Sequence, residues 1–277
     1  MTSILTNNGA MVALQTLNSI NMNLENTQNA ISTGKDVATA KDNSAIWAIS
    51  KVMESDVAGF NAVGDSLALG ESTVAVATAG AEQITELLKE MKEKVVNATG
   101  ENVENGKLAA EVTELKNQIT SIIKGSQFNG ANLLNKNGGD LTVLSSLDRN
   151  GTGTSSTVSA SNITVSSVNF EENLSLGTID VSNSTQAEAS IAKIETLIQT
   201  AINGAAALGA SAARIEKQSE FVSKVTDAMK SGIGALVDTD MEAASARLKA
   251  LQPQQQLGVQ ALSIANSAPQ TLQQLFR

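Results

Sequence analysis

Several residue types that catalytic sites commonly use are missing from this sequence of 277 residues. It has no cysteine, histidine or tyrosine, and its aromatic residues are five phenylalanines and one tryptophan. Without histidine and cysteine there is no imidazole base, thiolate nucleophile or disulfide, and a transition-metal site would need carboxylates alone. The sequence also shows no phosphate-binding loop, nucleophile elbow or zinc motif. We therefore expect a protein that is not an enzyme and holds no cofactor.

Positive charge and long apolar runs are also scarce. The 19 basic residues are outnumbered by 28 acidic ones, the formal net charge is −9, and no basic cluster could neutralise a run of phosphates. Residues 1–24 carry no charge, but asparagine and glutamine interrupt them, and their longest apolar run is residues 10–14. This pattern fits neither a membrane-spanning helix nor a Sec-type signal peptide. We expect no nucleic-acid partner and no membrane insertion.

Long heptad patterns dominate what is present. Positions from Ile46 to Val95 alternate steps of three and four residues, and nearly all of them are apolar. A helix over residues 43–99 would be about 85 Å long. The spacing continues from Leu108 to Ile122, and a late helix repeats it from Ile191 to Leu236. The sequence therefore predicts a mainly α protein, a long antiparallel coiled-coil rod.

Two further helices are predicted at the ends of the chain, and we expect them to pair. Residues 4–33 form the first, which Gly34 ends. Its predicted core positions are Leu14, Leu17, Asn21, Leu24, Gln28 and Ile31. The last helix begins with a capping box, in which Thr239 and Glu242 each satisfy a free backbone amide, and it continues to the C-terminus.

Both terminal helices avoid charge. Glu25 is the only charged residue in 1–34, and Arg277 is the only one after Lys249. Helices that pack against further copies of themselves would show this pattern, because burying an unpaired charge is costly. The residues expected at such an assembly interface are Leu14, Leu17, Asn21, Leu24, Gln28, Ile31, Leu257, Leu262, Leu272, Leu275 and Phe276. A coiled-coil signalling or binding bundle is the alternative from the residues alone.

Residues 129–185 differ in character and predict a small β-rich insert. Strands are expected at residues 163–170 and 179–181, with a hairpin turn at Asn150-Gly151. Residues 141–187 hold 18 serines and threonines and one basic residue, Arg149. We expect this stretch to bury little apolar surface and to face solvent.

Two acidic groups were weighed as sites. Asp238, Asp240 and Glu242 have calcium-loop spacing, but Ala243 and Lys249 stand where that loop needs Gly and Glu. A helix start is the better interpretation. The glutamates between residues 82 and 93 alternate with lysines, as on a solvated helix face.

Three motifs give the chain a resemblance to bacterial flagellin, over residues 4–135 and 205–277. They are Ala40-Lys41-Asp42-Asn43, Gln127-Phe128-Asn129-Gly130, and residues 256–277, which begin Gln-Leu-Gly-Val-Gln-Ala-Leu-Ser-Ile-Ala-Asn and end Leu-Phe-Arg. The resemblance implies three parts: a lumen-lining domain of residues 1–42 and 237–277, a helical rod of residues 43–128 and 186–236, and a surface insert of residues 129–185. The insert is too short for the large outer domains of many flagellins.

The resemblance also implies function and partners. The chain would polymerise with itself into the flagellar filament for swimming, and would be secreted to the extracellular flagellum by the flagellar type III export apparatus. An export chaperone and the hook-associated and cap proteins would be further partners. A hook-filament junction protein shares the terminal pattern and is the close alternative, although the Gln-Phe-Asn-Gly motif favours flagellin.

One residue departs from the family pattern. Many flagellins carry an Arg-rich stretch resembling Leu-Gln-Arg-Val-Arg-Glu-Leu, which the vertebrate innate receptor for flagellin reads. The aligned residues here are 88–94, Leu-Lys-Glu-Met-Lys-Glu-Lys, so Glu90 replaces an arginine. An anion cannot make the hydrogen bonds of a guanidinium, so this altered surface should bind the receptor poorly.

Overall fold

A computed structural model describes residues 7–150 and 157–275 of the chain, with the side chains of residues 268–275 left aside. Its elements are α1 (Asn8–Thr33), α2 (Ser44–Asn97), α3 (Asn105–Gly125), β1 (Leu141–Asn150), β2 (Thr157–Val165), α4 (Phe170–Asn173), η2 (Leu176–Thr178), α5 (Ser184–Val237) and α6 (Met241–Leu275). The mainly α fold with a small sheet is confirmed. None of the described helices is long and apolar enough to span a membrane.

The chain divides into two compact units. The terminal unit consists of Met1–Ser55 together with Ala228–Arg277, and the central unit is Asp56–Asp227. Helices α2 and α5, of 54 residues each, contribute to both.

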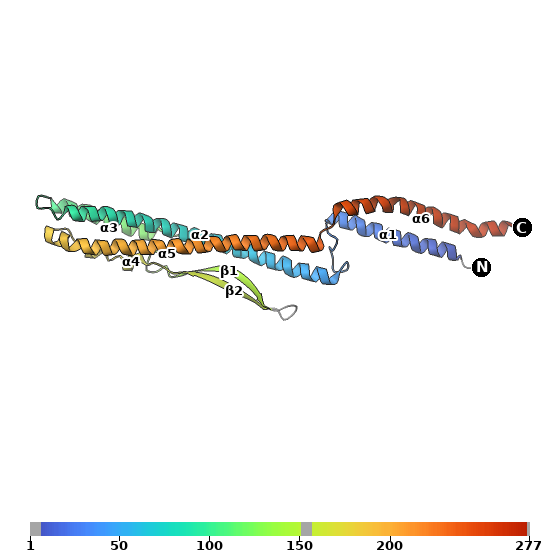
Figure 1. Cartoon of the computed structure of the whole chain (residues 1–277), viewed down its shortest axis with the longest axis horizontal. Helices are drawn as coiled ribbons and strands as arrows, with labels where there is room; N and C mark the ends of the chain where they lie inside the picture. The colour runs from blue at the N-terminus through green and yellow to red at the C-terminus, as the bar shows by residue number, and fades with distance from the viewer. Residues whose placement is uncertain (1–6, 151–156, 276–277) are drawn as a thin grey trace. The chain divides into compact units, whose positions relative to one another are not determined.

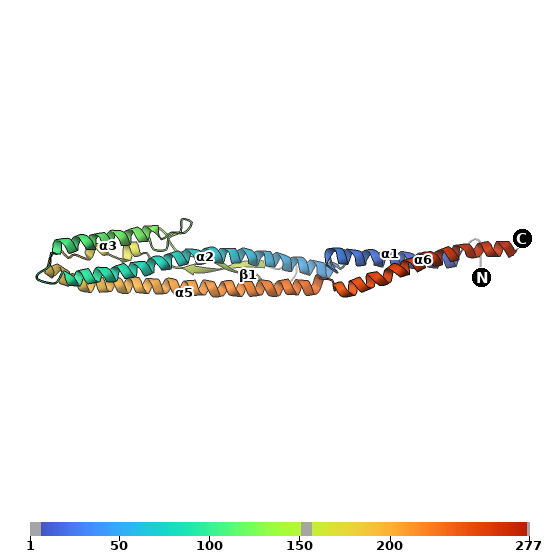
Figure 2. The same ribbon diagram turned by 90° about the horizontal axis from the view of Figure 1, so that it is seen from above.

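In the central unit, α2 and α5 run antiparallel and side by side (Figures 1 and 2). Every predicted seam position of α2 from Phe60 to Val95 is buried, as the heptad pattern requires. Ile194, Ala201 and Leu208 of α5 are buried with them. An exposed ion pair between Lys92 of α2 and Glu195 of α5 also joins the two helices at the surface.

Helix α3 doubles back along α2 in the central unit, as predicted. Its apolar stripe, Val112, Leu115, Ile119 and Ile123, is buried. The Lys94 ammonium of α2 lies 2.8 Å from a Glu111 carboxylate oxygen of α3. Three long helices therefore contribute to the core of this unit: α2, α3 and α5.

The sheet of the central unit is one antiparallel hairpin, in which Leu141 pairs with Val165 and Val143 with Ile163. The Ser66 hydroxyl of α2 accepts a hydrogen bond from the Leu144 amide at 3.2 Å. The Gln218 side chain of α5 donates to the Ser145 carbonyl at 2.8 Å. Both helices thus hold the hairpin by polar contacts to the backbone of β1.

Three predictions for the insert were wrong. Strand β2 ends at Val165, and Phe170 begins α4. Residues 179–181 form no strand, because Ile179 and Val181 are buried among the helices and the Ile179 carbonyl accepts a hydrogen bond from the Lys116 ammonium at 2.6 Å. The segment also does not lack apolar burial. One side of the hairpin and the following loop pack into the core, and the buried side chains are Val143, Ile163, Val165, Phe170, Leu174, Ile179 and Val181.

The predicted Asn150-Gly151 turn is only partly described. Asn150 ends β1, and Gly151 lies outside the described residues.

Glycines let the hairpin and the turn after α3 approach α2 closely. A Cβ atom at Gly70 would lie 2.5 Å from a Val143 methyl group. A Cβ atom at Gly80 would lie 2.2 Å from the Ser126 hydroxyl and 3.0 Å from a Leu134 methyl group. Ser126 cannot easily give way, because it is buried and its hydroxyl donates to the Ile122 carbonyl.

We expect Gly80→Ala to destabilise the protein, because the new methyl group overlaps Ser126 and Leu134. Overpacking of this kind costs about 1–3 kcal/mol in the free energy of unfolding. Urea denaturation followed by circular dichroism would measure the loss. Gly64→Ala is the matched control on α2, because no atom lies within 4 Å of its new Cβ atom and alanine favours the helix. Equal midpoints for the two variants would contradict the prediction.

Candidate assembly surface

The terminal unit contains the helices that the sequence marks for assembly. Helices α1 and α6 run antiparallel and side by side (Figures 1 and 2). The residues of α1 that are buried or half-buried at steps of three and four are Ala10, Ala13, Leu17, Ile20, Leu24, Thr27 and Ile31. Their counterparts on α6 are Ala244, Leu248, Leu251, Gln255, Gly258, Leu262 and Ala265. These two sets define the terminal seam.

The terminal seam is thin and partly polar. Of its members only Thr27, Ala244 and Leu251 are fully buried. The Asn7 side chain donates to the Ala265 carbonyl at 2.7 Å, and the Gln255 side chain donates to the Asn21 side chain at 2.8 Å. Small residues and surface hydrogen bonds give α1 and α6 little apolar burial compared with the α2 seam.

The structure divides the predicted core positions of α1 into two sets. Leu17, Leu24 and Ile31 are half-buried in the terminal seam. The prediction was wrong for the other three positions, because the residue just before each one, Ala13, Ile20 or Thr27, faces α6 instead. Leu14, Asn21 and Gln28 are exposed.

The predicted interface residues of α6 also divide. Leu262 lies in the terminal seam, whereas Leu257 is 69% exposed. Leu272 and Leu275 lie within α6, but their side chains are outside the described set, as is the whole of Phe276.

Further apolar side chains, which the sequence reasoning missed, stand exposed on the two helices. Met11, Val12 and Met22 project from α1, and Val259 and Ile264 from α6. They fall outside the heptad pattern, so periodicity could not find them. The signal available in the sequence was the absence of charge around them. With Leu14 and Leu257, these side chains point in several directions around the two helices, because residues two apart such as Val12 and Leu14 do not share a side of a helix. We call this set of exposed apolar residues outside the terminal seam the outer apolar face.

Two predicted seam positions elsewhere in the terminal unit were also wrong. Ile49 of α2 and Leu236 of α5 are exposed, and their neighbours Ser50 and Val237 are buried instead. At Val237 the cause is the backbone, because its carbonyl accepts from the amides of Asp36 and Val37 at 2.7 and 3.4 Å.

Two connecting segments of the terminal unit pair with each other. Gly34 ends α1 with a φ of 71°, as its predicted role requires. Lys35 and Asp238 form an isolated antiparallel bridge, and the Thr239 amide donates to the Gly34 carbonyl at 3.0 Å. The link after α1 is thus tied to the link before α6.

The capping box predicted for α6 was wrong. Asp240, not Thr239, caps the helix: its carboxylate accepts from the amides of Glu242 and Ala243, both at 3.0 Å. The Thr239 hydroxyl oxygen is buried and has no hydrogen-bond partner among the described residues. A carboxylate at the N-terminus of the helix also interacts favourably with the helix dipole, so the aspartate takes this position.

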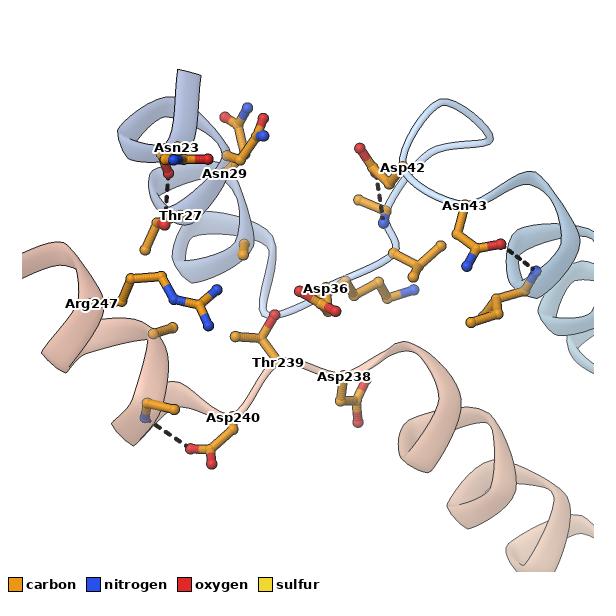
Figure 3. Close-up of a pocket in the computed structure, with 18 of the residues that line it drawn as sticks. Asn23, Thr27, Asn29, Asp36, Asp42, Asn43, Asp238, Thr239, Asp240 and Arg247 are labelled. Atoms are coloured by element: carbon orange, nitrogen blue, oxygen red, sulfur yellow. Dashed lines mark hydrogen bonds between the residues drawn. The ribbon is translucent and has the colours of Figure 1, made fainter. Parts of the chain in front are cut away.

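A polar cavity of about 770 Å³ lies beside this link (Figure 3). Its walls include Asn23, Asp36, Asp238, Thr239 and Arg247. The described residues hold no group of three or more carboxylates that could bind a metal ion. Amides, carboxylates, threonine hydroxyls, the Lys35 ammonium and the Arg247 guanidinium line the cavity, so it is rich in hydrogen-bonding groups.

Asp42 closes the turn before α2, at the edge of the same cavity. Its carboxylate accepts hydrogen bonds from the Thr39 amide at 2.8 Å, the Thr39 hydroxyl at 3.0 Å and the Ala38 amide at 3.2 Å. These bonds, chiefly the one from the Thr39 amide, hold the pKa of Asp42 below its usual 3.8. The turn is therefore built on an ionised carboxylate.

Glu90 lies exposed on α2 in the central unit. The lysines around it are already paired: Lys89 with Glu86 at 2.7 Å, Lys94 with Glu111, and Lys92 with Glu195. Glu90 itself makes no ion pair within the described part of the chain. Its carboxylate is free to meet a partner.

Comparison with known proteins matches both ends of the chain. Residues 4–138 match the model of the bacterial flagellin N-terminal helical region, and residues 191–276 that of the C-terminal helical region. The chain is 40% identical to Flagellin FljO of Caulobacter vibrioides over 280 residues, with 100% of this chain and 99% of that protein covered. It is also 40% identical to a flagellin of Brucella melitensis over 285 residues, covering all of both proteins. A solved structure of Bacillus cereus flagellin aligns with a TM-score of 0.48 and 20% identity, over 56% of this chain and 86% of that one.

We expect acid to open the turn that Asp42 closes. Because the pKa of Asp42 is lowered in the folded state, its stabilising effect is complete above its unfolded value, near 3.8, and is lost as the pH falls through the folded pKa. The amide resonances of Ala38 and Thr39 should titrate together in NMR spectra, with a midpoint below pH 3.8. The same two resonances should show no such titration in Asp42→Asn. A wild-type midpoint at or above pH 3.8 would contradict the assignment.

Proposed function

This chain belongs to the bacterial flagellin family and is a structural subunit of the flagellar filament, and we propose that its copies polymerise through the outer apolar face of α1 and α6. The protein is not an enzyme, and the filament it forms is extracellular. The matches favour neither a hook-filament junction protein nor a coiled-coil signalling bundle.

The exposure of the outer apolar face is the observation that carries this proposal. Leu14 is 48% exposed, Leu257 is 69% exposed, and the other five members of the face are 55–64% exposed. Each such side chain gains about 1.5–3 kcal/mol when it is buried completely. With Glu25 as the only charge of α1, little desolvation of charge opposes that gain. Contact between copies is the simplest way to bury the face.

The exposure of side chains also suggests which layer of the filament each part of the chain occupies. We propose that residues 1–42 and 237–277 line the filament lumen, that residues 43–128 and 186–236 form the next layer, and that residues 129–185 lie towards the outside. The exposed stretch of β2, residues 157–162, supports the last assignment, because four of its six side chains are polar and suit a solvent-facing position.

Further partners follow from the state of the chain before assembly. A subunit that carries the outer apolar face through the cytoplasm risks premature aggregation, so we propose that a flagellin export chaperone covers it. Passage through the flagellar type III export apparatus, and contacts with hook-associated and cap proteins in the filament, belong to the same proposal. Secretion to the cell exterior is its outcome.

Charge placed on the outer apolar face should block polymerisation. We expect Leu14→Asp and Leu257→Asp each to raise the critical concentration for filament formation at least tenfold, because an unpaired carboxylate would be buried at every contact. Sedimentation and electron microscopy would measure assembly, and circular dichroism would show whether the monomer stays folded.

Val158→Asp is the matched control, because Val158 is also an exposed apolar residue but lies on β2 of the central unit. It should polymerise like the wild type. Normal polymerisation of both α-helical variants would place the interface elsewhere, whereas failure of the wild type to polymerise would reject the filament function itself.

We also propose that Glu90 makes the monomer a weak ligand of the vertebrate innate receptor for flagellin. A guanidinium can donate two parallel hydrogen bonds to acceptors of a partner protein, and these bonds are lost when a carboxylate replaces it. If the partner surface is acidic, the carboxylate is also repelled. The neighbouring lysines cannot compensate freely, because each is paired with another glutamate.

Glu90→Arg should therefore raise receptor activation by the monomer more than tenfold in a reporter-cell assay, since a lost buried charge pair costs about 2–5 kcal/mol. Glu86→Arg, one helical turn away on α2, is the positional control and should raise it less. Strong activation by the unchanged monomer, at doses where an arginine-bearing flagellin saturates, would contradict this proposal.

A further inference from the structure

Two methionines of α1 are the most exposed of the methionines that the structure describes. Met11 and Met22 are each 64% exposed, Met241 is 46% exposed, Met53 and Met229 are half-buried, and Met91 is buried. The chain has no cysteine. Methionine thioethers are therefore its only sulfur groups, and among those in the described residues these two are the most accessible to a dissolved oxidant.

Met11 and Met22 share one side of α1. They are eleven residues apart, which is close to three turns of 3.6 residues, so their Cβ atoms stand within roughly 20° of each other around the helix axis. The seam residues Ala13, Ile20 and Thr27 lie on the opposite side, towards α6. Both thioethers therefore belong to the outer apolar face and take no part in pairing α1 with α6.

The chemistry of this site follows from the thioether. A hydroperoxide such as hydrogen peroxide transfers one oxygen atom to sulfur: the O–O bond breaks, an S–O bond forms, sulfur loses two electrons, and the peroxide leaves as water. The product, methionine sulfoxide, carries a strong hydrogen-bond acceptor in place of an almost apolar group. Reductases specific for this sulfoxide reverse the change.

We propose that Met11 and Met22 are a reversible oxidation site that controls assembly: as thioethers they are compatible with burial between copies, and as sulfoxides they prevent it. A sulfoxide buried against an apolar neighbour leaves its oxygen without a donor, and such an unpaired polar group is costly. The cost recurs at every subunit of the polymer. The proposal rests on the outer apolar face being the assembly interface.

The test uses the full-length purified chain. Monomer is treated with hydrogen peroxide until mass spectrometry of its peptides finds sulfoxide at residues 11 and 22, and filament formation is then followed by light scattering. We expect the critical concentration to rise at least tenfold and to return after treatment with methionine sulfoxide reductases. The double variant Met11→Leu/Met22→Leu should assemble equally well before and after peroxide. Met241→Leu, the matched control on α6, should remain as sensitive as the wild type.

A second measurement does not depend on variants. Peroxide added to finished filaments should oxidise Met11 and Met22 at least tenfold more slowly than in the monomer, because neighbouring copies cover them. The proposal is overturned if monomer carrying both sulfoxides assembles at the untreated concentration, if the double variant loses assembly as the wild type does, or if filaments leave both thioethers open to peroxide. Untreated wild type that fails to assemble would instead reject the filament function.

Discussion

The buried heptad seam of α2 is the constraint on which the central unit depends. From Phe60 to Val95 each seam position is buried, and the helices α3 and α5 and the hairpin are placed by what they pack against it. Gly70 and Gly80 set how near the hairpin and the turn after α3 can come, because side chains there would overlap Val143 and Ser126. Because glycine stands at these two contact points, α2, a helix of 54 residues, can pack against α3, α5 and the hairpin.

The terminal unit differs, because its two helices bury little apolar surface against each other. Half of its seam positions hold alanine, glycine, threonine or glutamine and most of its leucines are only half-buried, so α1 and α6 hold each other weakly, while several methionine, valine and leucine side chains stand exposed. A pair of helices of this kind is marginal on its own, since helical stability in proteins comes mainly from packing an apolar face. In the interface proposed above, polymerisation supplies the missing packing, and a weak internal seam leaves the pair able to adjust to its neighbours.

The sequence predicted long elements well and short ones poorly. The α2 seam and the Gly34 helix end depend on residue types that repeat or that have one conformational use, so periodicity and glycine chemistry find them. The hairpin was misplaced because its buried positions, such as Val143 and Ile163, are few and separated by serine and threonine. The cap of α6 was misassigned because Thr239 and Asp240 are both good caps. The path of the chain, with the Thr239 amide bound to Gly34, favours the aspartate in addition to the helix dipole.

The error on α1 has a deeper cause, which also explains its function. A heptad pattern assumes one partner, but this helix has apolar residues for two: Leu17 and Leu24 serve α6, while Met11 and Met22 face away from it. Around the helix axis, Leu14 lies between the side that faces α6 and the side that carries the two methionines. A heptad pattern fitted to the leucines therefore combines residues from both sides. A helix that packs against its own chain on one side and, in the proposed interface, against other copies on the other side cannot show one clean period. The missing charges were therefore the more informative signal, because both faces must avoid buried charge whichever partner they meet.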